Sequence, residues 1–346
     1  MENDFALSNG TIVQGSKNSY RILSCIRRDG MGFTYIGEPV KRQLTTPAKV
    51  VLREHFMPHC SLRGDDGVTV VSPPEISSTV ATCMKGFEKA SMDRARISDS
   101  SPSIINVLDI FETNGTFYYV VEFLDGITFE EYVNRKGPLS WDETREILSP
   151  ILDAVKKMHT YRAIHTEITP SHIRFVNHHG QSIPVLFSLY ATLHFNDEGK
   201  QNWTLPVMTC RTGYAPPEQY RSIDHFMPET DVYALASTIV FSLSGKHLPD
   251  SRVLTEEIVR ETLPPALPET TVKALIHALN PDPSLRTSSV TSLREELREF
   301  YGGKQRTTED DTEGEISLWR ELFYGSRVPL IILAFAVVAA TIIMLM

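Results

Sequence analysis

Hydrophobic residues change their spacing partway along the chain. From Tyr20 to about Phe123, short runs rich in β-branched and aromatic residues are separated by glycine and charged residues, which predicts strands joined by turns. One helical stretch, around Thr79 to Ile97, interrupts these strands. From Phe129 onward apolar residues recur every three or four positions, most clearly from Thr144 to His159, which predicts helices with one buried face. We therefore predict an α+β protein with a small β-rich lobe and a larger helical lobe.

The C-terminal part of the chain follows a different pattern. Residues 302–317 are rich in glycine, threonine and acidic residues, which predicts a flexible linker. Residues 318–327 are amphipathic and aromatic, as expected of a juxtamembrane segment at a membrane–water interface. Residues 328–346 carry no charge, and as a helix they would span about 28 Å, close to the hydrocarbon thickness of a bilayer. We expect a single C-terminal transmembrane anchor; the alternative, a buried globular helix, normally shows a polar face.

Charge and cysteine content narrow the functional classes. The chain has 34 basic and 43 acidic residues and a formal net charge of −9, which argues against nucleic-acid binding. Arg320 and Arg327 precede the apolar segment and no basic residue follows it, so we expect the preceding domain in the cytoplasm. The four cysteines form no CxxC pair, which favours reduced thiols over a zinc site or disulfides. The N-terminus lacks the apolar run of a signal peptide.

Several motifs occur in the order found in one family. The segment Gly213 to Tyr220, with sequence GYAPPEQY, resembles the end of the activation loop of protein kinases. Asp231 resembles the start of their central C-lobe helix, and Arg286 resembles the arginine that pairs with the glutamate of the activation segment, here Glu218. His165 resembles the first residue of their His-Arg-Asp loop. Together these motifs resemble the bacterial branch of eukaryotic-type serine/threonine protein kinases over roughly residues 20–301.

The resemblance implies a bilobal protein-kinase-like fold. It divides the chain into an N-terminal segment (1–19), an N-lobe (20–123) and a C-lobe (124–301), followed by the linker (302–317), the juxtamembrane segment (318–327) and the transmembrane anchor (328–346). In the family, the residues at the positions of His165, Glu218, Asp231 and Arg286 hold the fold together. We therefore expect structural roles for these four residues.

The positions that carry chemistry in the family are replaced. Glu167 stands at the catalytic aspartate, Thr169 at the catalytic-loop lysine and His172 at the magnesium-binding asparagine. Ser188 stands at the metal-binding aspartate, although hard cations prefer carboxylate oxygens and imidazole suits magnesium poorly. Arg174 replaces an apolar residue of the adenine pocket, where an unsatisfied head group would be costly. We therefore expect no catalytic residue and no metal site.

The nucleotide-binding positions of the N-lobe are also altered. Arg27 and Asp29 occupy the first two positions of the glycine-rich loop, and only Gly32 remains of its three glycines. Arg53 replaces the phosphate-binding lysine, but its planar fork does not match lysine geometrically. An ion pair between Arg53 and Glu88, on the following helix, is the expected arrangement. We expect no cofactor, and any ATP binding would be weak.

The division between retained scaffold and lost chemistry implies a pseudokinase. We expect a catalytically inactive, membrane-tethered kinase-like domain that acts as a protein-binding scaffold or regulator in signalling, with another protein, such as a kinase or a membrane signalling component, as its partner. One alternative is an atypical or weak ATP-dependent serine/threonine kinase, because Glu167 keeps a carboxylate that could act as a base. A second alternative is a nucleotide-binding switch without phosphoryl transfer, because Arg53 retains some attraction for phosphate.

Overall fold

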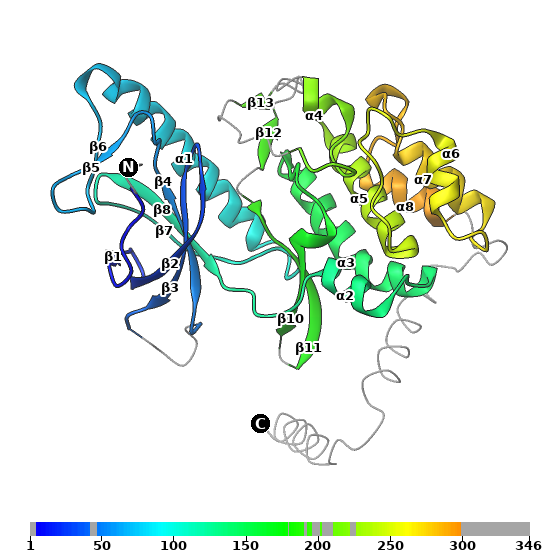
Figure 1. The fold of residues 1–346 in the computed structure, drawn as a ribbon, viewed down its shortest axis with the longest axis horizontal. Coiled ribbons are helices and arrows are strands. Elements are labelled where there is room, and N and C mark those ends of the chain that lie inside the picture. The colour runs from blue at the N-terminus through cyan, green and yellow to red at the C-terminus, as the bar shows by residue number, and fades with distance from the viewer. Residues whose placement is uncertain are drawn as a thin grey trace, which may run out of the picture. The chain divides into compact units, whose positions relative to one another are not determined.

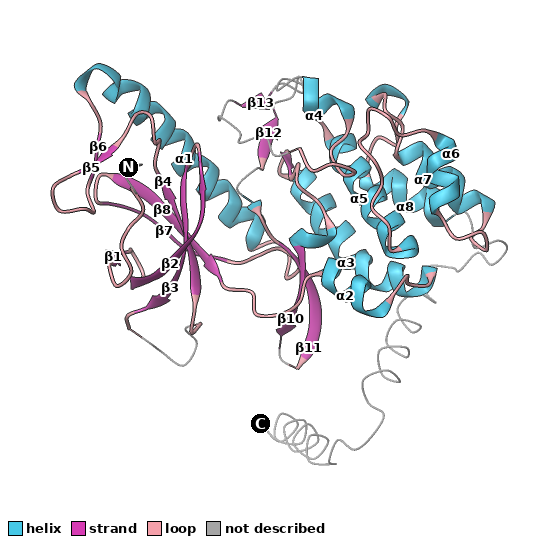
Figure 2. Cartoon of the chain, viewed as in Figure 1, coloured by secondary structure: helices cyan, strands magenta, loops and turns pink. Residues whose placement is uncertain are grey.

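The computed structural model describes residues 5–41, 47–178, 180–189, 192–195, 201–202, 210–221 and 226–298. Residues 1–300 form one compact unit. Within the described part of this unit, an antiparallel sheet and one long helix make up the N-terminal lobe, and helices dominate the C-terminal lobe (Figure 1, Figure 2). The predicted α+β bilobal architecture is therefore confirmed.

The predicted transmembrane helix lies outside the described residues, as do the predicted linker and juxtamembrane segment. Among the helices that the structure does describe, none has both the length and the apolar character that crossing a membrane requires. The membrane anchor at 328–346 therefore stays a prediction.

The N-terminal lobe is built on a six-stranded sheet in the order β1-β2-β3-β4-β8-β7, and every neighbouring pair is antiparallel. Helix α1 packs on β7 and β8, where the sequence predicted a helix between strands. A short hairpin of β5 and β6 and the 3₁₀ helix η1 connect β4 to α1. The elements of this lobe are β1 (Ile12–Gln14), β2 (Ser19–Asp29), β3 (Gly32–Pro39), β4 (Val50–His55), β5 (Leu62–Arg63), β6 (Val70–Val71), η1 (Pro74–Ile76), α1 (Ser77–Ser98), β7 (Val107–Thr113) and β8 (Thr116–Glu122).

The sheet is buried on both faces. Successive side chains of a strand point to opposite sides, and on β8 each side faces its own core. On β8, Tyr119 and its neighbours two residues away belong to a large core shared with α1 and the C-terminal lobe. Tyr118 belongs to a smaller core on the opposite face. On β4, Glu54 hydrogen-bonds Tyr118 and so lies on the face of the smaller core, while the adjacent Arg53 lies on the face that carries α1.

The C-terminal lobe is mainly helical, with two small antiparallel sheets near the candidate site. Helix α3 begins with a capping box, in which Ser140 and Glu143 bond each other's backbone N–H groups. The elements are α2 (Phe129–Lys136), α3 (Trp141–Thr160), β9 (Ala163–Ile164), η2 (Pro170–His172), β10 (Ile173–His178), β11 (Gln181–Leu186), β12 (Leu193–Phe195), β13 (Gln201–Asn202), α4 (Pro217–Arg221), α5 (Pro228–Ser244), α6 (Glu256–Thr262), α7 (Glu269–Ala278), η4 (Pro283–Leu285) and α8 (Val290–Arg298).

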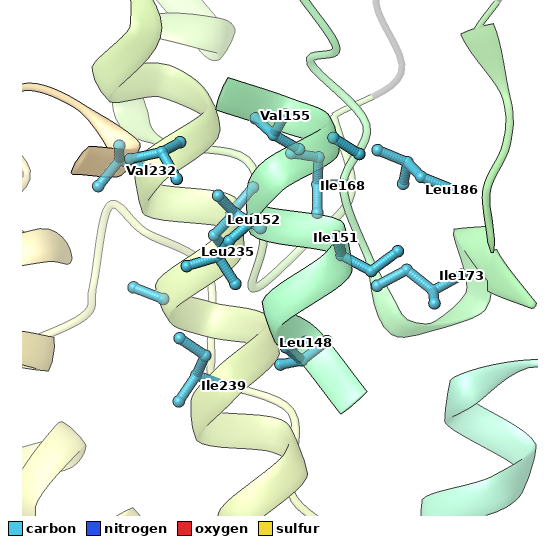
Figure 3. Packing of buried hydrophobic residues seen from close by; sticks show 14 of the residues in the cluster. Leu148, Ile151, Leu152, Val155, Ile168, Ile173, Leu186, Val232, Leu235 and Ile239 are labelled. Carbon is cyan, nitrogen blue, oxygen red and sulfur yellow. The ribbon is translucent and has the colours of Figure 1, made fainter. Parts of the chain in front are cut away.

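Packing around α3 fixes the segment that leads into the candidate site. Helix α5 is buried along almost its whole length and packs against α3. Figure 3 shows Leu152 of α3 beside Leu235 of α5, and Ile151 on another side of α3 beside Ile173 of β10. Ile168, between β9 and η2, is fully buried in the same core. The loop that carries Glu167 is therefore held against α3 by its apolar neighbour.

Candidate functional site

Asp231, near the start of α5, holds the backbone of the candidate catalytic loop. Its side chain is fully buried and accepts hydrogen bonds from the N–H groups of His165 (2.8 Å) and Thr166 (2.9 Å). The same carboxylate contacts Nε2 of His159 at 2.9 Å. Thr166 adopts a left-handed backbone conformation with φ of 65°, which costs a non-glycine residue about 1 kcal/mol or more. The carboxylate thus fixes a conformation that the loop would rarely adopt alone.

His165 connects this loop to the end of the β10–β11 hairpin. Its Nδ1 accepts a hydrogen bond from the N–H of Glu167 at 3.2 Å, and its Nε2 donates to the carbonyl of Phe187 at 2.9 Å. Burial lowers the pKa of the imidazole, because desolvation disfavours the charged form. His165 is therefore a neutral, structural histidine in which Nε2 carries the proton.

Glu167 and Ser188 contact each other directly. The hydroxyl of Ser188 donates to Oε2 of Glu167 at 2.9 Å. Glu167 is only 2% exposed, and Ser188 has a left-handed backbone with φ of 73°. The resemblance assigns the catalytic base and a metal ligand to these two positions. Here the two side chains bond each other, and the second brings no negative charge.

His172 and Thr169 are also engaged by their own surroundings. Nδ1 of His172 donates to the carbonyl of Glu167 at 2.7 Å, and its ring lies edge-on to Phe187. Burial lowers the pKa of His172 to about 4, so the ring is neutral at pH 7. The hydroxyl of Thr169 contacts that of Ser171 at 2.9 Å. Within the described ranges, no group of three or more histidine, cysteine or acidic side chains is placed to hold a metal ion.

Asp29 and Arg53 form a buried ion pair in the N-terminal lobe. Asp29 ends β2 and pairs with Gly32 across the turn into β3, and its Oδ1 lies 2.5 Å from NH2 of Arg53. The two side chains expose only 9% and 5% of their surfaces. Arg53 also donates from NH1 to Thr34 at 3.1 Å, and Nε of Arg27 lies 3.3 Å from Oδ2 of Asp29. The carboxylate of the loop is therefore bound by the arginine that replaces the phosphate-binding lysine.

The expected partner of Arg53 was Glu88, and the structure corrects this. Both residues are described, and no ion pair joins them. The buried positions of α1 follow a spacing of three and four residues that includes Phe87, Ala90 and Arg94 but omits Glu88. Glu88 follows the buried Phe87 by one residue and therefore lies outside the buried face of α1. That face contains no acidic residue.

The guanidinium of Arg174 donates to the segment that joins the lobes, but its Nε is buried without a hydrogen-bond partner among the described residues. NH1 donates to the carbonyl of Leu124 at 3.0 Å, and the guanidinium lies 5.4 Å from the ring centre of Phe187. These contacts offset only part of the cost of placing this head group in a partly buried site. Arg174 contacts the segment after β8 where the resemblance places an apolar wall for adenine.

Arg94 is a site residue that the sequence analysis did not single out. It is buried on α1, its Nε donates to the carbonyl of Leu189 at 2.7 Å, and its guanidinium lies 5.5 Å from the ring centre of Tyr119. It therefore ties α1 to the residue that follows Ser188. Its place as the one charged residue among the buried positions of α1 is the sequence signal that could have identified it.

Glu218 and Arg286 are brought together as the resemblance implied. The two nitrogens of the Arg286 guanidinium donate to the two oxygens of Glu218 at 2.7 and 3.1 Å, a bidentate geometry. Arg286 also donates to the backbone carbonyls of Asn280 and Glu229, so its contacts join α4, α5 and the segment before α8. This pair stabilises the end of the activation segment.

Two curated proteins that are similar to this chain are both described as serine/threonine-protein kinases. The chain is 26% identical over 301 residues to serine/threonine-protein kinase C of a Synechocystis strain, covering 85% of this chain and 52% of that protein. It is 26% identical over 284 residues to a probable serine/threonine-protein kinase, PknB, of Lactococcus lactis, covering 79% of this chain and 40% of that protein. The chain thus spans about half the length, or less, of these curated relatives.

The chain is also similar to a solved structure and matches a family model. The structure titled "PpkA-294 apo form" matches 85% of this chain and all of its own with a TM-score of 0.59, and its 22% identity shows a shared fold alone. A family model described as a protein kinase domain matches residues 88–297, more than half of the chain. The chain belongs to the protein kinase domain family.

Proposed function

We propose that this chain is a catalytically inactive member of its family, a pseudokinase that acts by binding another signalling protein. The observation that carries the proposal is the hydrogen bond between Ser188 and Glu167 at the centre of the candidate site. Phosphoryl transfer depends on metal ions and cations that neutralise developing charge. A serine hydroxyl supplies no charge, and general base catalysis by Glu167 alone would contribute only about 10²–10⁴-fold.

Two further contacts, both at positions that bind nucleotide in the family, support the proposal. Arg53, at the phosphate-binding position, is engaged by Asp29. Arg174 donates to the carbonyl of Leu124 at the position that the resemblance assigns to adenine. Arg53, at the phosphate-binding position, and the backbone at the position assigned to adenine are thus both in contact with side chains of the protein itself. The partner we propose is another protein, such as a kinase or a membrane signalling component, because binding is the activity left to such a domain.

The full chain, purified in a mild detergent, is expected to show no hydrolysis of ATP and no autophosphorylation above buffer with magnesium or manganese. Incorporation of labelled phosphate measures this, with an active serine/threonine kinase assayed in the same detergent as the positive control. Glu167→Gln should behave like the unaltered chain. Phosphoryl transfer that disappears in Glu167→Gln would instead support the alternative of an atypical or weak kinase.

The proposed pseudokinase is tethered to a membrane through residues 328–346, since that segment carries no charged residue. Deleting 328–346 is expected to move the protein from the membrane fraction to the soluble fraction, measured by centrifugation and immunoblotting. Deleting residues 302–317 removes the predicted linker but leaves the apolar segment, and this variant should stay with the membranes. A chain that remains membrane-bound without 328–346 would contradict the proposed anchor.

A further inference from the structure

The turn between β2 and β3 is packed tightly onto the end of β4. The carbonyl of Met31 accepts a hydrogen bond from the N–H of Phe56 at 3.1 Å. Gly32 has a φ of 140°, and a Cβ atom there would lie 1.9 Å from the carbonyl oxygen of Glu54, so only glycine fits. The position of the turn is therefore fixed by backbone contacts that do not involve the side chain of Asp29.

The carboxylate of Asp29 makes contacts typical of a bound anion. Its Oδ1 accepts from the N–H of Met31 at 2.9 Å and contacts NH2 of Arg53 at 2.5 Å, while Nε of Arg27 lies 3.3 Å from Oδ2. NH1 of Arg53 donates to the hydroxyl of Thr34, which fixes the direction of the guanidinium. Arginine presents several donors in a rigid fork that suits carboxylate and phosphate oxygens equally well. The donors around Asp29 therefore resemble an anion-binding site that the carboxylate of Asp29 occupies.

We propose that Asp29 is a built-in anionic ligand that occupies a metal-independent polyphosphate site formed around Arg53. Removing the charge of Asp29 opens this site, and the backbone contacts of Met31 and Gly32 keep the turn in place. The proposal rests on the proposed function, because it explains how the same site excludes nucleotide in a member that does not transfer phosphate. The side chain of Arg174 contacts the position expected for adenine, so the opened site recognises phosphate groups rather than the base.

The variant Asp29→Asn tests the proposal, because an amide oxygen can still accept the N–H of Met31 but carries no charge. Calorimetry is done on the full chain in detergent and EDTA, with inorganic tripolyphosphate as the probe and ATP as a second arm. We expect Asp29→Asn to bind tripolyphosphate at least tenfold more tightly than the unaltered chain, and ATP no more tightly than tripolyphosphate. The gain should disappear in the double variant Asp29→Asn with Arg53→Met.

Asp66→Asn is the matched control. Asp66 is another turn aspartate, and its carboxylate accepts the N–H groups of Val68 and Thr69. This variant should bind tripolyphosphate no better than the unaltered chain.

Three results would overturn the proposal. These are equal binding by Asp29→Asn and the unaltered chain, a gain that survives Arg53→Met, and ATP binding more than tenfold tighter than that of tripolyphosphate. If Asp29→Asn does not fold, as judged by its thermal transition, Asp29→Ser replaces it, since a hydroxyl can also accept the N–H of Met31. Binding in EDTA is measured without turnover, so magnesium-dependent phosphoryl transfer would contradict the proposed function and leave this test unaffected.

Discussion

Replacing Arg63 by methionine is expected to lower the free energy of unfolding by about 3–5 kcal/mol, because it leaves a buried charge without its partner. Glu54 is fully buried, and its two oxygens accept hydrogen bonds from NH1 and NH2 of Arg63 at 2.8 and 2.6 Å. The hydroxyls of Tyr35 and Tyr118 also donate to this carboxylate. Two neutral hydroxyls cannot balance a negative charge on the interior face of the sheet.

Arg63 has packing contacts that methionine preserves only in part. Its guanidinium lies 4.8 Å from the ring centre of Phe56, and its Nε donates to the carbonyl of Phe5, which holds the N-terminal segment on the sheet. Methionine keeps an apolar stem of similar length, so most of the expected loss reports on the charge of Glu54.

Urea denaturation of the full chain in detergent measures the effect from the shift in midpoint at unchanged slope. Arg96→Met is the matched control, because Arg96 is 73% exposed and forms only a 3.4 Å contact with Asp93. It should change the free energy of unfolding by no more than about 0.5 kcal/mol. The double variant Glu54→Gln with Arg63→Met should be more stable than Arg63→Met alone. A loss below about 1 kcal/mol in Arg63→Met would show that Glu54 is not a buried charge in need of a partner.

The arrangement of strands and helices could be predicted because apolar spacing reports it directly. The helix predicted around Thr79 to Ile97 is α1, and the alternation between Tyr118 and Tyr119 on β8 reflects a strand buried on both faces. The partner of Arg53 could not be predicted in the same way. The face of α1 that meets the sheet depends on helix register, and a shift of one residue exchanges Glu88 for a buried apolar position.

The replaced chemical positions could be identified from motif order, but their contacts could not. Asp29 was identified as a replacement in the glycine-rich loop, and the structure adds that its carboxylate binds Arg53, a residue brought close by the antiparallel pairing of β2, β3 and β4. Residue spacing offers no reason to pair Glu54 with Arg63, because only the fold shows that Glu54 lies on the face of the smaller core. Long-range ion pairs of this kind depend on tertiary structure, which residue spacing does not encode.

Lowering the pH from 7.5 to 4.5 is expected to destabilise the folded protein by on the order of 5 kcal/mol through two buried histidines. Burial lowers the pKa of His55 and of His172 from 6.5 to about 4. Between pH 6.5 and pH 4 each histidine binds a proton in the unfolded chain but not in the folded protein. Stability is therefore fully present above pH 6.5 and falls as the pH decreases towards 4, by about 1.4 kcal/mol per pH unit for each histidine.

The variant His172→Asn isolates one of the two contributions, because an asparagine amide can donate to the carbonyl of Glu167 as Nδ1 of His172 does. Urea midpoints at several pH values between 7.5 and 4.5 should show a smaller pH dependence in His172→Asn, and likewise in His55→Gln, than in the unaltered chain. The double variant should retain the contributions of His165 and His194, whose pKa values burial also lowers. An unchanged pH dependence in both single variants would mean that these rings are protonated in the folded protein. In that case a charged imidazole of His172 would donate to the carbonyl of Glu167.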